Sequence, residues 1–136
     1  LLIEVLHPAE QPSITDSLND NVLVLRLRYG EVSFLLTSDL STDGQFALLD
    51  GSTWPTATVL QLPDHATRGS LASEFLTAVQ PSVFALQVDA ANRRGDPDGD
   101  VLNLLDDTIP LYRTDEQGVL HFWTDGEDLW FVQEAD

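Results

Sequence analysis

Short apolar runs with strand-like alternation are interleaved along the chain with segments of helical period. The first run alternates around Glu4, and a later pair of runs is separated by a turn that contains Gly30, which predicts a β-hairpin. The predicted strands cover 1–6, 22–29, 32–37, 57–62, 83–88, 109–112, 118–123 and 128–132.

Helices are predicted in three of the intervening segments. Ser41-Thr42-Asp43 is a typical helix start, and Gly51 is the expected stop of that helix. A second helix is predicted over 70–79, and a short one over 101–105. The predicted buried positions are Phe46, Leu48 and Leu49 on the first helix and Leu71, Phe75, Leu76 and Val79 on the second. Segments 9–21 and 89–98 are rich in polar and turn-forming residues and predict loops.

Length and composition indicate one globular α/β domain over 1–136, with helices packed on at least one face of a sheet. No apolar run approaches the roughly 20 residues that cross a bilayer, so no membrane span is expected in this segment. Cysteine is absent, which excludes disulfides and thiolate metal sites. The chain has no methionine and opens within an apolar run, so we expect it to be a fragment of a longer protein.

The charge balance is strongly acidic, with 23 acidic residues against six basic residues and a net charge of −17. All six basic residues are arginines. Nucleic-acid affinity comes largely from neutralising phosphates, so we expect no direct nucleic-acid binding by this segment. A solvated acidic surface is the favoured interpretation; cation binding and docking of a basic partner are the alternatives.

Five local patterns in the same order carry a resemblance to a known family. The patterns are Asn19-Asp20-Asn21 before a β run, Phe34-Leu35-Leu36-Thr37-Ser38-Asp39, Leu62-Pro63-Asp64-His65-Ala66, Asn92-Arg93-Arg94-Gly95-Asp96-Pro97, and Leu111-Tyr112-Arg113-Thr114-Asp115 with Gly118. Together they cover nearly the whole chain. On these residues the chain resembles the C-terminal half of the metallo-β-lactamase-fold domain of ComEC-type competence proteins.

This resemblance implies half of an αββα sandwich, with a mixed sheet and helices on one face. Full-length members take part in DNA uptake, and the segment would be an extracytoplasmic soluble domain of a bacterial envelope protein. Active members hold two divalent metals, usually zinc or manganese, and a metal-bound hydroxide attacks a phosphodiester. By position, Asp39 matches the family's bridging aspartate. Asp64 and His65 occupy the positions of the family's metal-binding His-His pair.

Three further residues are candidates for substrate contact or for support of the metal ligands. Asp96 stands where the family has the histidine of Gly-His-Pro, and the other two are Asn21 and Asn92. The metal candidates are therefore Asp39, Asp64 and His65, and no catalytic residue and no cofactor is assigned.

The departures from the family pattern concern the metal site. The His-rich first metal motif has no counterpart, and the three histidines (His7, His65 and His121) form no pair. Ser38 and Ala66 replace glycines that bring backbone close to the site. We therefore expect an eroded metal site and a structural or binding module. The alternative is the second half of a metal-dependent phosphodiesterase whose N-terminal metal motif lies outside this chain. The expected partner is the remainder of its own longer chain or a second copy, because half a sandwich would expose an apolar sheet face.

Simpler interpretations exist for each candidate. Asp39 is also a plausible helix cap, and His65 an ordinary hydrogen-bonded loop histidine. Asp64 is an oxygen ligand that suits magnesium or calcium. The alternating aspartates of 96–100 favour a solvated loop over a calcium loop. Arg93 and Arg94 are expected to pair with Asp89 and Asp96, and anion binding is the alternative.

Overall fold

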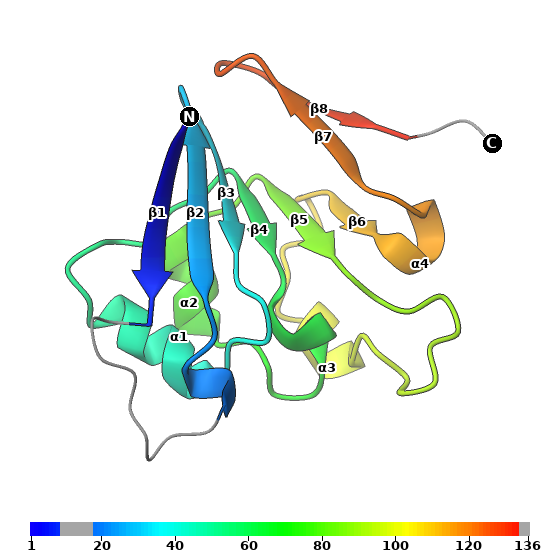
Figure 1. Ribbon diagram of the computed structural model, residues 1–136. Helices are drawn as coiled ribbons and strands as arrows, with labels where there is room; N and C mark the ends of the chain where they lie inside the picture. Colours follow the sequence, from blue (N-terminus) through cyan, green and yellow to red (C-terminus); the bar gives the residue numbers. More distant parts are fainter. Residues whose placement is uncertain (9–17, 134–136) are drawn as a thin grey trace.

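A mixed six-stranded sheet and a separate β-hairpin form the framework of the protein (Figure 1). The computed structural model describes residues 1–8 and 18–133; the predicted loop over 9–21 therefore lies mostly outside the described residues. The strands of the sheet follow one another in chain order: β1 (Leu2–His7), β2 (Val24–Tyr29), β3 (Val32–Leu36), β4 (Val59–Gln61), β5 (Val83–Leu86) and β6 (Leu111–Arg113). Strands β1 to β3 are antiparallel, and β3 to β6 are parallel.

Three helices connect the parallel strands and lie on one face of the sheet (Figure 1). Parallel neighbours require crossover connections, and crossovers of one hand place their helices on the same side. These helices are α1 (Thr42–Leu49), α2 (Ser73–Val79) and α3 (Gly99–Leu102). The core between them and the sheet includes Leu35, Leu60, Phe84 and Leu86 from the strands and Leu48, Phe75, Val79 and Val101 from the helices. The predicted α/β class with a mixed sheet is confirmed.

The helix predictions need three corrections, of which the first concerns bounds: the helix predicted over 101–105 is α3, at Gly99–Leu102. Ser41 caps α1 as expected, because its hydroxyl accepts a hydrogen bond from the Gly44 backbone at 3.0 Å. Phe46, however, is 43% exposed; the buried side of α1 consists of Gly44, Gln45 and Leu48. The prediction that Phe46 is buried was wrong, because the helix turns its other side to the core.

The buried side chain of Gln45 also explains why α2 begins three residues later than predicted. Its amide group donates to the backbone oxygen of Ser70 at 2.7 Å and accepts from the backbone N–H of Ala72 at 2.9 Å. These bonds hold 70–72 outside the helix. Gln45 thereby ties the two helices together in a fully buried position, where unpaired amide groups would be costly.

The C-terminal segment forms a hairpin that packs against the other face of the sheet. Its elements are the short helix α4 (Thr114–Gln117), β7 (His121–Thr124) and β8 (Leu129–Val132). Phe122 lies edge-on to Phe34 with ring centres 6.1 Å apart, and Phe131 stacks on Tyr112 at 3.8 Å. The segment between the predicted strands at 109–112 and 118–123 thus contains a turn of helix. Among the described residues, the predicted strands at 118–123 and 128–132 pair only with each other.

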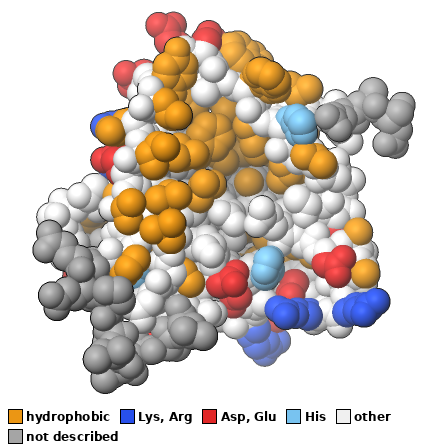
Figure 2. Space-filling model, in the orientation of Figure 1, with side chains coloured by type: hydrophobic (Ala, Val, Ile, Leu, Met, Phe, Trp, Pro, Cys, Tyr) orange, Lys and Arg blue, Asp and Glu red, His pale blue; other side chains and the backbone are white. Residues whose placement is uncertain are grey.

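On β1 to β3, this sheet face is apolar and partly exposed. Cross-strand pairing aligns Ile3, Leu27 and Phe34 in one row, and Val5, Leu25 and Leu36 in the next. Ile3 is 58% exposed and Val5 is 62% exposed. Hydrophobic side chains gather over β1, β2 and β3 on the face seen in Figure 2. We call the side chains of Ile3, Val5, Leu25, Leu27 and Leu36 the open face.

The hairpin is anchored at its turn as well as by its aromatic rings. The backbone N–H of Glu31 donates to the carbonyl oxygen of Gly126 at 2.7 Å, so the β2–β3 turn touches the β7–β8 turn. Gly30 adopts a φ of +60°, and a Cβ atom on it would lie 2.2 Å from the same oxygen. Only glycine allows this approach.

Replacing Gly30 by alanine should therefore loosen the hairpin. Gly69→Ala is a matched control, because Gly69 also has a positive φ (+73°) but no atom lies within 4 Å of its added Cβ. Both variants carry backbone strain, and Gly30→Ala should lose a further ~1–3 kcal/mol to the steric clash. Urea unfolding followed by tryptophan fluorescence would measure the difference. Equal stabilities of the two variants would contradict the anchoring role.

Candidate functional site

Loops at the carboxyl ends of the parallel strands meet at one edge of the sheet, where ligands bind in open α/β folds. The loop after β4 is bonded to the loops on either side. The Asp64 backbone N–H donates to the carbonyl oxygen of Ser38 at 3.0 Å, after β3. On the other side, the His65 ring nitrogen Nδ1 lies 2.9 Å from the carbonyl oxygen of Gln87, after β5. The sheet topology thus joins segments that are far apart in the sequence.

His65 and Asp39 face each other at this edge. Because a carbonyl oxygen only accepts, the contact with Gln87 places a proton on Nδ1, and the neutral ring then presents a lone pair at Nε2. Nε2 lies 3.7 Å from Oδ1 of Asp39, and both side chains are about half exposed. Metal-binding histidines are held in this way, with the other ring nitrogen donating to a carbonyl.

The backbone at this edge is held in an uncommon conformation. Five non-glycine residues adopt positive φ there: Ser38 (51°), Asp64 (45°), His65 (55°), Ala66 (57°) and Asn92 (38°). Left-handed conformations of such residues cost of order 1 kcal/mol each and concentrate at functional sites. Ser38 and Ala66 thus adopt backbone conformations that glycine reaches freely, although both residues carry a Cβ atom.

The described residues do not assemble the donors that a two-metal centre needs. Asp64 turns its carboxylate to its own loop, where Oδ2 accepts from the Thr67 hydroxyl at 2.6 Å. Within residues 1–8 and 18–133, no group of three or more His, Asp or Glu side chains is placed to hold a metal. A zinc site takes four ligands, so Asp39 and His65 by themselves do not fit two metals.

The candidates for substrate contact lie in two places. Asn92 and Asp96 line a cavity of about 350 Å³ together with His65, which agrees with a position at the same edge. Asn21 follows the turn η1 (Leu18–Asp20), which contacts the start of α1 through the bond from Ser41 N–H to the Asn19 oxygen at 3.1 Å. Ser41, and not Asp39, is the cap of α1.

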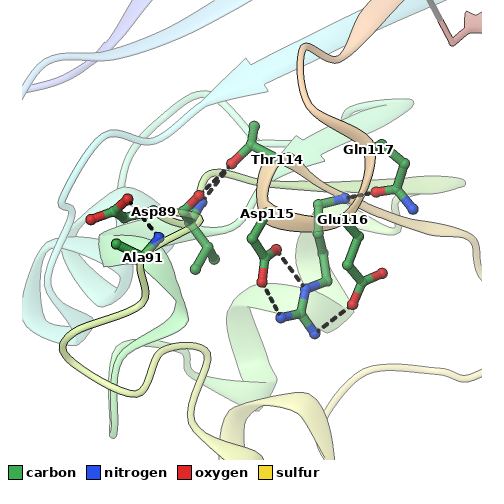
Figure 3. A network of polar contacts seen from close by, with 8 residues as sticks. Asp89, Ala91, Thr114, Asp115, Glu116 and Gln117 are labelled. Carbon is green, nitrogen blue, oxygen red and sulfur yellow. Dashed lines mark hydrogen bonds and ion pairs between the residues drawn. The ribbon is translucent and has the colours of Figure 1, made fainter. Parts of the chain in front are cut away.

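A polar network that sequence reasoning missed fixes the loop after β5 (Figure 3). The Thr114 hydroxyl accepts from the backbone N–H of Val88 and donates to its carbonyl oxygen, both at 2.8 Å. Next to it, Arg113 forms a two-pronged contact with Asp115, at 3.1 and 2.7 Å, and a further one with Glu116 at 3.2 Å. Arg113, Thr114 and Asp115 belong to the matched pattern 111–115, but the pattern itself did not indicate that Thr114 bonds to Val88.

The arginines of the loop after β5 are arranged differently from the prediction. Arg93 and Arg94 line the same cavity as His65. Neither forms an ion pair within the described part of the chain, so the predicted pairing with Asp89 and Asp96 was wrong. Asp89 instead accepts from the backbone N–H of Ala91 at 3.0 Å, in a local turn. Asp98, from the same acidic stretch, caps α3 through the Asp100 backbone N–H at 2.9 Å.

The Arg113 pair makes a pH-dependent contribution to stability. The pKa of Asp115 lies below its ordinary value of 3.8, chiefly because Arg113 donates hydrogen bonds to the carboxylate. The unfolded chain then takes up this proton first as the pH falls. The contribution is therefore complete above pH 3.8 and is lost as the pH falls through the lower native value.

Asp115→Asn should consequently lose less stability on acidification than the unsubstituted protein does. The measurement is the urea midpoint between about pH 6 and pH 2. Glu116→Gln is the matched control, because it removes an exposed carboxylate and leaves the Arg113–Asp115 contact in place. Parallel pH profiles for Asp115→Asn and the unsubstituted protein would refute the contribution.

Two curated proteins are similar to this chain. It is 32% identical over 124 residues to ComE operon protein 3 of Bacillus subtilis (strain 168), an alignment that covers 90% of this chain and 16% of that protein. It is 34% identical over 123 residues to competence protein ComA of Neisseria gonorrhoeae, covering 88% of this chain and 17% of that protein. No protein-family model and no solved structure matches the chain. Among the described residues, no helix is long and apolar enough to span a membrane. The two matches support a competence-related family.

Proposed function

We propose that this chain, a relative of two competence proteins, is a structural or binding module of a DNA-uptake protein, with a metallo-β-lactamase-like fold and an eroded metal site. The observation that best supports this proposal is that about nine tenths of the chain aligns with each of the two competence proteins. The chain spans 16% and 17% of those proteins, so its partner in this proposal is the remainder of a longer chain of its own.

The open face supports a role in binding a partner. Exposed apolar side chains that form a contiguous patch mark interaction surfaces in soluble proteins. Here Ile3 and Val5 are more than half exposed in the same sheet face that Phe34 shares with the hairpin. A second sheet packed on this face would complete a sandwich. A second copy of the chain is the alternative occupant.

The small number of possible metal ligands supports the proposal of an eroded metal site. Asp39 and His65 are the two candidates that face each other, and Asp64 bonds to Thr67. A hydrolytic metal centre needs more ligands than this pair supplies. The position of His65 favours one second candidate function. The hydrogen bond from Nδ1 to Gln87 leaves Nε2 available, as in metal-binding histidines. This arrangement is compatible with the second half of a metal-dependent phosphodiesterase whose other metal ligands come from a further segment.

The isolated chain should accordingly bind neither zinc nor manganese stoichiometrically and should not hydrolyse bis-p-nitrophenyl phosphate in their presence. Metal content after dialysis and product absorbance are the measurements. Stoichiometric metal together with turnover that is lost in both Asp39→Ala and His65→Ala would reverse the assignment. Asp43→Ala is the matched control, since Asp43 is an exposed aspartate on the first turn of α1.

The competence role can be tested by exchanging this chain for the matched 124-residue segment of the Bacillus subtilis protein and measuring transformation frequency. The chimera should support transformation, and Asp39→Ala within it should keep the frequency unchanged. Ile3→Arg combined with Val5→Arg should reduce it severely, because the charges would be buried in the proposed interface.

Leu104→Arg is the control for the open face, since Leu104 is a 45% exposed leucine outside that surface. A chimera that accumulates normally but does not transform would count against the competence role. A normal frequency in the Ile3→Arg, Val5→Arg double variant would remove the open face from it. Loss of transformation in Asp39→Ala alone would favour the hydrolase alternative.

A further inference from the structure

The six arginines of this protein divide into those with a carboxylate partner among the described residues and those without one. Three of the six pair with carboxylates: Arg26 with Glu4, Arg68 with Asp98, and Arg113 with Asp115. Arg93 and Arg94 form no ion pair within residues 1–8 and 18–133, although acidic residues outnumber basic ones by 23 to six in the sequence. Within the described part of the chain, these two adjacent guanidinium groups therefore have no carboxylate partner.

Both arginines line the cavity of about 350 Å³. This cavity lies at the edge of the sheet where the loops after β3, β4 and β5 meet, which we call the functional edge. The charged side chains of its lining are these two arginines and two aspartates, Asp89 and Asp96, so their formal charges cancel. This cavity is much less repulsive to an anion than the remainder of a chain that carries −17. Figure 2 shows basic side chains grouped beside a histidine and acidic side chains along the lower edge of the molecule.

The loop that carries the arginines is held at both ends and within its turns. Thr114 fixes its start through two bonds to Val88, and the Asp98 N–H fixes its end by donating to the Ala66 oxygen at 2.9 Å. Between these points, the Asn92 N–H donates to the Asp89 oxygen at 2.8 Å. The cavity is thus largely formed before a ligand binds, which lowers the entropic cost of binding.

We propose that Arg93 and Arg94 form a subsite for one phosphate group of a ligand no larger than a mononucleotide. The planar guanidinium fork matches phosphate geometry and donates charge-assisted hydrogen bonds. The cavity volume falls at the lower end of the range for small-molecule sites, roughly 300–1,000 Å³. A long polyanion would meet the surrounding acidic surface, whereas a single phosphate meets the neutral cavity. This inference rests on the proposed binding role and names the ligand chemistry of that role.

The test is a titration of the isotope-labelled full chain, in the presence of EDTA, followed by NMR. The probes are inorganic phosphate, thymidine 5′-monophosphate and thymidine. Both phosphates should shift the signals of residues 88–96 and of the arginine side-chain N–H groups, and thymidine should not. The double variant Arg93→Gln, Arg94→Gln should bind at least about tenfold more weakly, since each charged hydrogen bond is worth ~1.5 kcal/mol or more.

Arg28→Gln is the matched control. Arg28 is exposed, forms no ion pair within the described residues and lies near the β2–β3 turn, at the opposite end of the sheet strands. This control should bind phosphate within about twofold of the unsubstituted chain, because it removes one arginine charge at a distance from the cavity.

The subsite is overturned if neither phosphate binds, if Arg28→Gln weakens binding as much as the double variant does, or if thymidine binds as well as its monophosphate. Binding of inorganic phosphate and of the nucleotide with similar affinity identifies the phosphate as the recognised group. Stronger binding of the nucleotide places the sugar or base in the cavity as well. Phosphate binding in the presence of EDTA requires neither metal-dependent hydrolysis nor transformation. A negative result for the subsite is therefore distinguishable from a negative result for the proposed function.

Discussion

Burial of one sheet face beneath three helices is the constraint on which the other features of this protein depend. Leu35, Leu60 and Phe84 turn to the helices, and Phe75 is fully buried among them. Strand residues alternate between faces, so filling one face commits the neighbouring residues to the other. The same crossovers bring the carboxyl ends of β3, β4 and β5 to one edge. The core therefore determines both where the open face lies and where the functional loops meet.

Hydrogen bonds between side chains and backbone, more than ion pairs, hold the functional edge together. His65 bonds to the Gln87 carbonyl, and the adjacent Val88 is clamped by Thr114. The half-exposed contact between Asp39 and His65 adds little stability of its own. The carbonyl oxygens of Ser38 and Ala66, two residues with left-handed backbone, accept from the backbone N–H groups of Asp64 and Asp98. Under the proposed function, these bonds would let the edge keep its shape with an eroded metal site.

The open face covers β1 to β3, whereas the functional edge lies at the carboxyl ends of β3 to β5, which allows the two roles to be separate. A partner on Ile3 and Val5 would cover the sheet without covering the cavity that Arg93 and Arg94 line. The similarity to two competence proteins over most of the chain is compatible with a module inside a larger machine. Within that proposal, the edge contributes recognition of a small anion, and the face contributes attachment.

The amino-acid sequence by itself determined the order and type of most elements, because apolar periodicity and turn residues act locally. The hairpin of β2 and β3, the Ser41 cap and the positions of Asp39 and His65 at strand ends could all be predicted in this way. Local patterns could not show that Phe46 faces solvent, that Gln45 delays α2, or that the last two strands pair apart from the sheet.

Only the tertiary structure decided which candidate residues meet. It brought His65 to Asp39 and to Gln87, turned Asp64 to Thr67, and left Arg93 and Arg94 without carboxylate partners in the described chain. The physical reason is that contacts between strand-end loops depend on strand order and on the backbone conformation of each loop. Neither is encoded in the spacing of any single motif. The sequence could therefore name candidate residues, and the fold decided which of them lie together.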